Sequence, residues 1–95
     1  WQITAANTAA KAITDITGAK AGVAYIIECG STENATTIAK SDKFADITEA
    51  YTPTKEGDYI MIILNSKGNF LELERQVGGV REVNAALQPN IPGVR

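Results

Sequence analysis

One segment, residues 58–64 (DYIMIIL), constrains the fold of this chain more than any other. It is rich in β-branched and aromatic residues, which favour strands. The loop Asn65-Ser66-Lys67-Gly68 follows it, a composition typical of a short hairpin connection in which glycine takes a positive φ angle. A second β-rich run, residues 69–75, comes directly after. The sequence therefore predicts an antiparallel hairpin with these two strands.

The first strand of this hairpin is apolar on both faces. Alternation along a strand puts Tyr59, Met61 and Ile63 on one face, opposite the face of Ile60, Ile62 and Leu64. A single small sheet with one core supplies only one apolar face, so two alternatives stay open. The strand is central in a sandwich within one chain, or its Tyr59, Met61 and Ile63 face lies against another subunit.

The second strand of the hairpin alternates more clearly. Leu71 and Leu73 share one face, whereas Glu72 and Glu74 share the other with Phe70. We expect the leucine face to point inward and the glutamate face to be mostly solvated. The two glutamates would lie about 7 Å apart, a spacing seen in some glycosidases, but a solvated face is the commoner state of such a pair.

Four further strands are predicted from shorter β-rich runs bounded by turn residues. Residues 12–17 and 23–29 are expected to be adjacent strands joined by residues 18–22. Residues 36–39 and 44–48 are expected to form a weaker pair around the polar turn 40–43. No stretch of ten or more residues has a convincing helical period. The predicted fold is all-β, a small antiparallel β-sandwich or barrel-like module with extended terminal arms.

The two ends of the chain differ from its middle. The 95 residues fit one domain, and we expect an N-terminal arm (1–11), a β module (12–75) and a C-terminal arm or linker (76–95). Such arms either lie across a neighbouring molecule or fray. Residues 80–87 fit a strand or a short helix equally well. The candidate interface residues in the C-terminal arm are Val80, Leu87 and Ile91.

Residue types that support catalysis are scarce. The chain has no histidine and a single cysteine, Cys29, which excludes Ser-His-Asp and Cys-His nucleophile pairs and the commonest metal ligand. The acidic residues do not follow the pattern of a calcium loop, and no glycine-rich phosphate loop is present. We predict that the protein is not an enzyme and has no cofactor.

Charge and hydropathy restrict the partners. The net charge of −2, with no cluster of Lys and Arg, disfavours nucleic acid. The longest apolar run has six residues, against roughly 20 needed to cross a bilayer, so no membrane span is expected. The classes of partner that remain are proteins and carbohydrates. Tyr51 precedes the loop 52–57 and is the candidate ligand contact, because loops on rigid scaffolds carry recognition.

A series of short motifs follows one another along residues 12–75. In chain order they are Ile13-Thr14-Asp15-Ile16-Thr17-Gly18, Gly22, Tyr25-Ile26-Ile27, Thr37-Ile38-Ala39, Phe44, Tyr51-Thr52-Pro53-Thr54, Gly57-Asp58-Tyr59-Ile60 and Phe70-Leu71-Glu72-Leu73-Glu74-Arg75. In this order they resemble a β-rich module of tailed-phage and prophage virion proteins, which occurs in fibres and in capsid-associated proteins. The individual motifs are common, so their order carries the resemblance.

The resemblance implies a non-catalytic virion component, often trimeric, that decorates a head or forms part of a fibre. Residues matching the module's turn glycines are Gly18, Gly22 and Gly57, and those matching its packing positions are Phe70, Leu71 and Leu73. One turn departs from the pattern, because the module usually reads Asn-Gly-Gly-Asn-Phe where this chain has residues 40–44 (KSDKF).

The expected function is therefore that of a phage virion structural module, located in the virion, which forms a homo-oligomer and docks on other virion proteins. A different class competes with it. An extracellular or cell-surface module would instead bind a ligand such as carbohydrate through Tyr51 and neighbouring loop residues.

Overall fold

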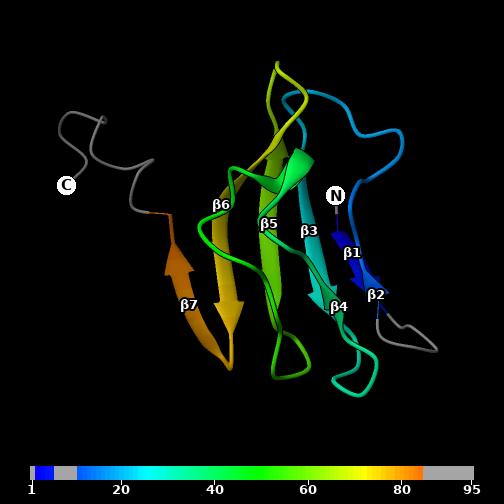
Figure 1. Ribbon diagram of the computed structural model, residues 1–95. Coiled ribbons are helices and arrows are strands. Elements are labelled where there is room, and N and C mark those ends of the chain that lie inside the picture. Colours follow the sequence, from blue (N-terminus) through cyan, green and yellow to red (C-terminus); the bar gives the residue numbers. More distant parts are fainter. Residues whose placement is uncertain (1, 6–10, 85–95) are drawn as a thin grey trace, which may run out of the picture.

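The computed structural model describes residues 2–5 and 11–84 (Figure 1). A five-stranded sheet has the order β1-β3-β5-β6-β7, and β2 and β4 pair separately. The strands of the main sheet are β1 (Gln2–Ala5), β3 (Ala24–Cys29), β5 (Tyr59–Leu64), β6 (Phe70–Val77) and β7 (Val80–Val83). The remaining elements are β2 (Lys11–Ala12), β4 (Thr36–Thr37) and the 3₁₀ turn η1 (Asp42–Phe44). The predicted all-β class is confirmed.

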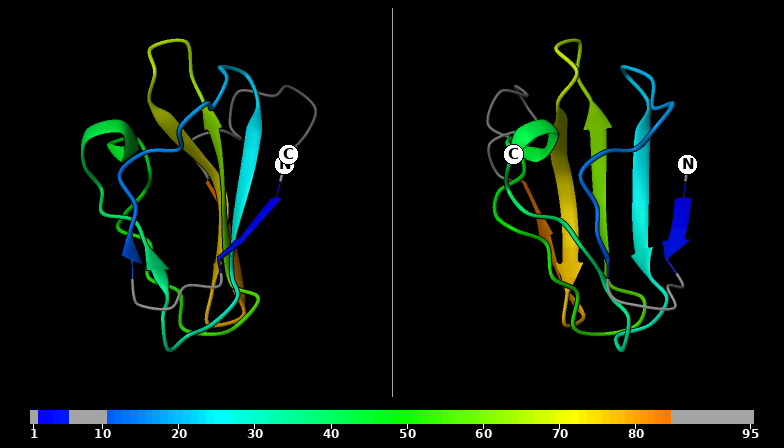
Figure 2. Two further views of the ribbon diagram at one scale, coloured as in Figure 1. Left: turned by 90° about the vertical axis from the view of Figure 1, so that its right-hand side faces the viewer. Right: turned by 45° about the vertical axis from the view of Figure 1, so that its right-hand side comes forward.

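Strands β3, β5, β6 and β7 pair in antiparallel fashion, and β1 runs parallel to β3 at one edge. The segments that carry β2, β4 and η1 lie over one face of this main sheet and form a second, less regular layer (Figure 2). Within the described residues the molecule is thus a small two-layer β structure with a covered and an open face.

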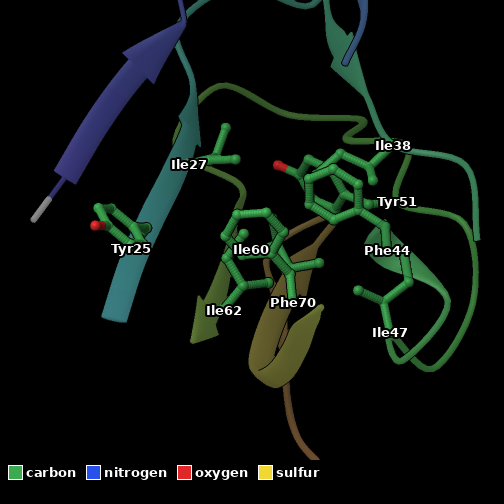
Figure 3. Close-up of a cluster of buried hydrophobic side chains, with 9 residues drawn as sticks. All are labelled: Tyr25, Ile27, Ile38, Phe44, Ile47, Tyr51, Ile60, Ile62 and Phe70. Carbon is green, nitrogen blue, oxygen red and sulfur yellow. The ribbon is translucent and has the colours of Figure 1, made fainter. Parts of the chain in front are cut away.

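The hydrophobic core fills the space between the two layers (Figure 3). Strands β3, β5 and β6 supply Tyr25, Ile27, Ile60, Ile62 and Phe70. The opposite layer supplies Ile38, Phe44, Ile47 and Tyr51. The rings of Phe44 and Phe70 stack with centroids 4.9 Å apart and an interplanar angle of 14°. Apolar anchors therefore hold a layer that has few strand hydrogen bonds of its own.

The hairpin of β5 and β6 is confirmed. Its loop closes with hydrogen bonds from Gly68 N to Asn65 O (3.1 Å) and from Asn65 N to Asn69 O (2.8 Å). Gly68 has a φ of 88°, as the loop composition predicts. The Asn65 side chain accepts the N–H groups of Lys67 and Asn69, so this asparagine organises the turn from its first position.

The expected strand over residues 12–17 is wrong beyond its first residue. Strand β2 ends at Ala12 and pairs in parallel with β4, and it is not a neighbour of β3. Local hydrogen bonds compete with a ladder here: Asp15 Oδ1 accepts the N–H of Ile16 (2.8 Å), and Ile16 O accepts the N–H of Ala19 (3.2 Å). The β-branched residues of this segment therefore contribute to packing and not to a strand, since Ile13 and Ile16 lie against the core.

The predicted strand 44–48, and its pairing with 36–39, are also wrong. Residues Asp42–Phe44 form η1, and Ile38 instead pairs with Tyr51 through two backbone hydrogen bonds of 2.7 and 3.0 Å. Phe44 and Ile47 are both 1% exposed. Their spacing of three residues suits a tight turn, which puts i and i+3 on one side, whereas a strand would send them to opposite faces.

The predicted facing of β6 is wrong as well. Its buried residues are Phe70, Glu72 and Arg75, whereas Leu71 and Leu73 are only partly buried. The register explains this: Ile62 lies opposite Glu72 and Met61 opposite Glu74, so Leu73 is an extra residue in a bulge. The bulge changes the alternation, and Glu72 faces the core.

The boundaries of the β module extend beyond residues 12–75. Strand β1 lies within the predicted N-terminal arm, while the end of β6 and all of β7 lie within the predicted C-terminal arm. The open choice for residues 80–87 is resolved as a strand for Val80–Val83. Candidate interface residues Leu87 and Ile91 lie outside the described residues. No helix among those described is long and apolar enough to span a membrane.

Candidate functional site

The face of the main sheet that points away from the core is the surface best suited to binding. On β5, Ile60 and Ile62 are fully buried, whereas Tyr59, Met61 and Ile63 are only partly buried. The second layer lies on the other side (Figure 2). Of the two alternatives for β5, the described residues do not form a sandwich that buries both faces.

We define the open face as the partly buried residues Ile26, Tyr59, Met61, Ile63 and Leu71. Register places them side by side, since Ile26 lies opposite Met61 and Leu71 lies opposite Ile63. A shallow hollow of about 270 Å³ is lined by Ile26, Glu28, Tyr59 and Met61. Directly opposed side chains on a pleated sheet are in contact, so this is a continuous, mostly apolar patch.

A fixed polar group borders the open face. Tyr59 donates its hydroxyl hydrogen to Glu74, and Arg81 binds both oxygens of the same carboxylate at 3.1 Å. The hydrogen bonds from Arg81 and Tyr59 lower the pKa of Glu74, and the bond to Glu74 raises the pKa of Tyr59. Tyr59 therefore keeps its proton and its ring position while Glu74 stays ionised.

The carboxylates that the sequence placed on one face are separated. Glu72 points into the protein, where Arg75 binds it through Nε (3.1 Å) and Nη2 (2.7 Å), and Glu74 points to the open face. The same Arg75 donates to Glu49 O (2.6 Å) and Ala50 O (3.1 Å). This cluster joins β6 to residues 48–50 of the second layer, because Thr48 also donates to Glu72 (3.1 Å). Its geometry is that of a structural anchor.

A second buried carboxylate, Asp58, is fully inaccessible to solvent. It accepts the N–H groups of Thr54 (3.0 Å), Lys55 (2.9 Å), Gly78 (2.7 Å) and Gly79 (3.0 Å). Burial alone would raise the pKa of Asp58, but these four donors lower it to about 2. Asp58 therefore remains charged and ties the loop before β5 to the turn between β6 and β7.

The expectation that Tyr51 is a surface contact is wrong. Its side chain is 1% exposed and belongs to the core, and the guanidinium of Arg75 lies 5.9 Å from its ring centroid. Its hydroxyl oxygen is buried without a hydrogen-bond partner in the described part of the chain. Burial raises the pKa of Tyr51 above its ordinary value. The backbone bridge between Tyr51 and Ile38 holds the Tyr51 ring in the core. The position of Tyr51 before a loop in the sequence does not reveal this bridge.

The remaining candidate residues divide between the surface and the interior. Val80, in the edge strand β7, is 63% exposed. Cys29 is a buried free thiol whose sulfur contacts Ser31 O at 3.4 Å. Within residues 2–5 and 11–84, no three Cys, Asp or Glu side chains converge as a metal site would need.

Comparison with protein-family models, curated proteins and solved structures gives no match.

Sequence reasoning missed the two buried carboxylates, Glu72 and Asp58. Part of each network comes from a distant segment and consists of backbone groups: Arg75, which binds Glu72, donates to two carbonyls at residues 49–50, and Asp58 accepts the N–H groups of the glycines at 78–79. Backbone donors and acceptors exist at every residue and give no compositional signal. The pair Gly78-Gly79 was the one visible cue, since it marks a turn whose N–H groups are accessible to an anion.

Proposed function

We propose that this protein is a non-catalytic structural module of a phage virion that acts by self-association and by docking on neighbouring virion proteins. Two things support the proposal. The order of motifs along residues 12–75 resembles such modules, and the main sheet has a core on one face only.

The observation that carries the self-association is the composition of the open face. Four of its five members, Ile26, Met61, Ile63 and Leu71, are aliphatic, yet the described chain builds its second layer on the other side. Each square ångström of apolar surface removed from water contributes roughly 25 cal/mol to association. A second copy packed on this face would give β5 the two-sided cover that its sequence predicts.

The rim of the open face suits the same role. Protein interfaces combine an apolar centre with a polar rim, and ordered rims lose little side-chain entropy on binding. Here Tyr59, Glu74 and Arg81 are already held by one another in the free chain. They therefore offer a pre-organised border to the apolar residues Met61 and Ile63.

The competing function, carbohydrate binding through Tyr51, is not favoured by the geometry. Stacking on a sugar requires an accessible aromatic face, and the Tyr51 ring is enclosed between the Arg75 guanidinium and the core. Tyr59 is the aromatic residue of the open face, but its hydroxyl is already bound to Glu74.

Self-association is tested by sedimentation velocity over a range of protein concentrations. We expect the unmodified chain to form a discrete oligomer and Met61→Asp to be monomeric but still folded by far-UV circular dichroism, because Met61 is only partly buried in the single chain. Lys67→Asp, at the exposed tip of the β5–β6 hairpin, is the matched control and should leave the oligomer intact. A chain that stays monomeric at high concentration would contradict the proposal.

The virion assignment is tested separately through gene neighbourhood. A gene that lies beside portal, terminase or tail genes, with the product detected by mass spectrometry in purified particles, would support it. A product that is absent from purified particles would refute it, whatever the oligomeric state.

A further inference from the structure

The edge strand β7 presents a second binding surface, which is distinct from the open face. Among the described residues it is the outermost strand on this side of the main sheet, and all four of its side chains are exposed. Three large hydrophobic residues in the described part of the chain are exposed, and two of them, Val80 (63%) and Val83 (43%), lie on this strand. Exposed β-branched residues on an unpaired edge favour the addition of another strand.

The backbone of β7 has its free groups at two defined residues. Asn84 donates its N–H to Leu73 O on β6 (2.9 Å), and backbone groups alternate between the two sides of a strand. Val80 and Glu82 therefore also point their backbone groups at β6. The N–H and C=O groups of Arg81 and Val83 point the other way, to the edge, where no described residue pairs with them.

A hollow of about 490 Å³ lies beside this edge, on the core side of the sheet. Its lining includes Glu49 and Ala50 from the second layer, and Arg75, Val77, Val80 and Glu82 from β6 and β7. A strand added to β7 would direct every second side chain into this hollow, because opposed residues on paired strands share a face.

The charges around the hollow select the side chain that enters it. Arg75 is the one cation in its lining, and that guanidinium is already bound to Glu72 and to two carbonyl oxygens. Glu82 forms no ion pair within residues 2–5 and 11–84, and the Glu49 side chain is 75% exposed, with its carboxylate 4.0 Å from Arg75. Net negative charge above the apolar Val77 and Val80 fits a Lys or Arg side chain, which has an aliphatic stem and a cationic end.

We infer that β7 binds an extended segment of a partner protein by strand addition, with a basic side chain of that segment opposite Glu82 and inside the hollow. The segment pairs with the outward N–H and C=O groups of Arg81 and Val83. This inference does not depend on self-association through the open face, because it uses the β7 edge of the sheet and the hollow beside it. Arg81 alone belongs to both surfaces, with its backbone at the edge and its side chain bound to Glu74 at the border of the open face.

The test uses the full chain, ¹⁵N-labelled, and a blocked peptide, acetyl-Thr-Val-Thr-Lys-Thr-Val-Thr-amide, at a protein concentration where the chain alone shows no concentration dependence. Amide hydrogen exchange should slow at Arg81 and Val83 and stay unchanged at Val80 and Glu82, which already face β6. Replacing the central Lys of the peptide by Gln should weaken binding about two- to fivefold, and Glu should weaken it further, as cross-strand charge pairs require.

Two variants sharpen the result. Glu82→Lys should reverse the preference so that the Glu peptide binds best, whereas Glu33→Lys, an equal charge change on an exposed loop, should preserve the original order. Val83→Pro removes one outward N–H at an edge position where proline is tolerated, and should weaken all three peptides equally.

Three outcomes would overturn the inference. The first is no slowing at Arg81 and Val83 at the highest soluble peptide concentration. The second is equal affinity for the Lys and Glu peptides. The third is slowing at these two amides that rises with protein concentration in the absence of peptide, which would identify a second copy of the chain as the occupant of the edge.

Discussion

Arg75 and Glu72 lie on the same face of β6 although they are three residues apart, with Nη2 of Arg75 2.7 Å from Oε1 of Glu72. A regular strand would send them to opposite faces. The bulge at Leu73 adds one residue and brings both side chains to the core side. Their side chains are 5% and 2% exposed, so the pair is buried and is anchored to residues 48–50.

Arg75→Met is expected to lower the free energy of unfolding by about 3–5 kcal/mol, because it leaves the Glu72 carboxylate buried without its cation. Urea unfolding followed by far-UV circular dichroism measures the loss. The double variant Glu72→Leu/Arg75→Met removes both charges and should recover most of the stability. A single variant that loses less than about 1 kcal/mol would show that Glu72 is solvated in solution.

Asp58→Asn is expected to destabilise the fold by about 1–3 kcal/mol at pH 7, since one amide oxygen replaces a carboxylate that accepts four N–H groups. The folded pKa of Asp58, about 2, lies below the unfolded value near 3.9. Its contribution is therefore complete above about pH 4 and is lost as the pH falls towards 2. The free energies of unfolding of the wild type and the variant, measured at pH 7, 4, 3 and 2, should converge as the pH falls. A difference that stays constant over these pH values would contradict this role.

Tyr51→Phe is expected to leave stability unchanged or to raise it by up to about 1 kcal/mol, because the lost hydroxyl is buried and unpaired. Tyr51→Ala, by contrast, should cost about 3–5 kcal/mol through the cavity it creates. Thermal unfolding of both variants measures the difference. If Tyr51→Phe proved clearly destabilising, the hydroxyl would have a partner in solution, such as a buried water.

The two glycines of the β6–β7 turn should differ in their response to substitution. Both have positive φ angles, 64° for Gly78 and 80° for Gly79, as a two-residue hairpin turn of type I′ requires. A Cβ on Gly78 would lie 3.2 Å from Thr54 Oγ1, whereas one on Gly79 would meet only the flexible Lys55 side chain, at 3.8 Å. Gly78→Asn should therefore destabilise more than Gly79→Asn in urea unfolding, and equal losses would contradict this packing.

Much of the main sheet is predictable from local composition. The β5–β6 hairpin and β3 combine β-rich runs with turn residues at their ends, and these signals are contained within about ten residues. The second layer is different, because Phe44, Ile47 and Tyr51 pack as single anchors from irregular segments. Runs such as 12–17 and 44–48 have strand-like composition, but local side-chain hydrogen bonds and a 3₁₀ turn replace the ladder there.

The candidate surfaces divide in the same way. The face of Tyr59, Met61 and Ile63 was predictable because side chains alternate regularly along β5. Ile60 and Ile62 point to the core, and the residues between them point to the other face. Alternation failed for Glu72 because a bulge leaves no mark in the sequence, and for Tyr51 because a bridge to Ile38 fixes its ring. The hollow beside β7 brings residues 49–50 next to residues 80–82, a proximity that only the folded chain creates.

Asp58 has a consequence for the order in which the protein is made. During synthesis the carboxylate leaves the ribosome about twenty residues before the glycines that complete its set of donors. Until then it retains two nearby N–H groups and the surrounding water, so enclosing it is costly. Final enclosure of Asp58 beside β5 thus awaits the β6–β7 turn, and we expect a nascent chain that stops short of Gly78 to remain open at this corner.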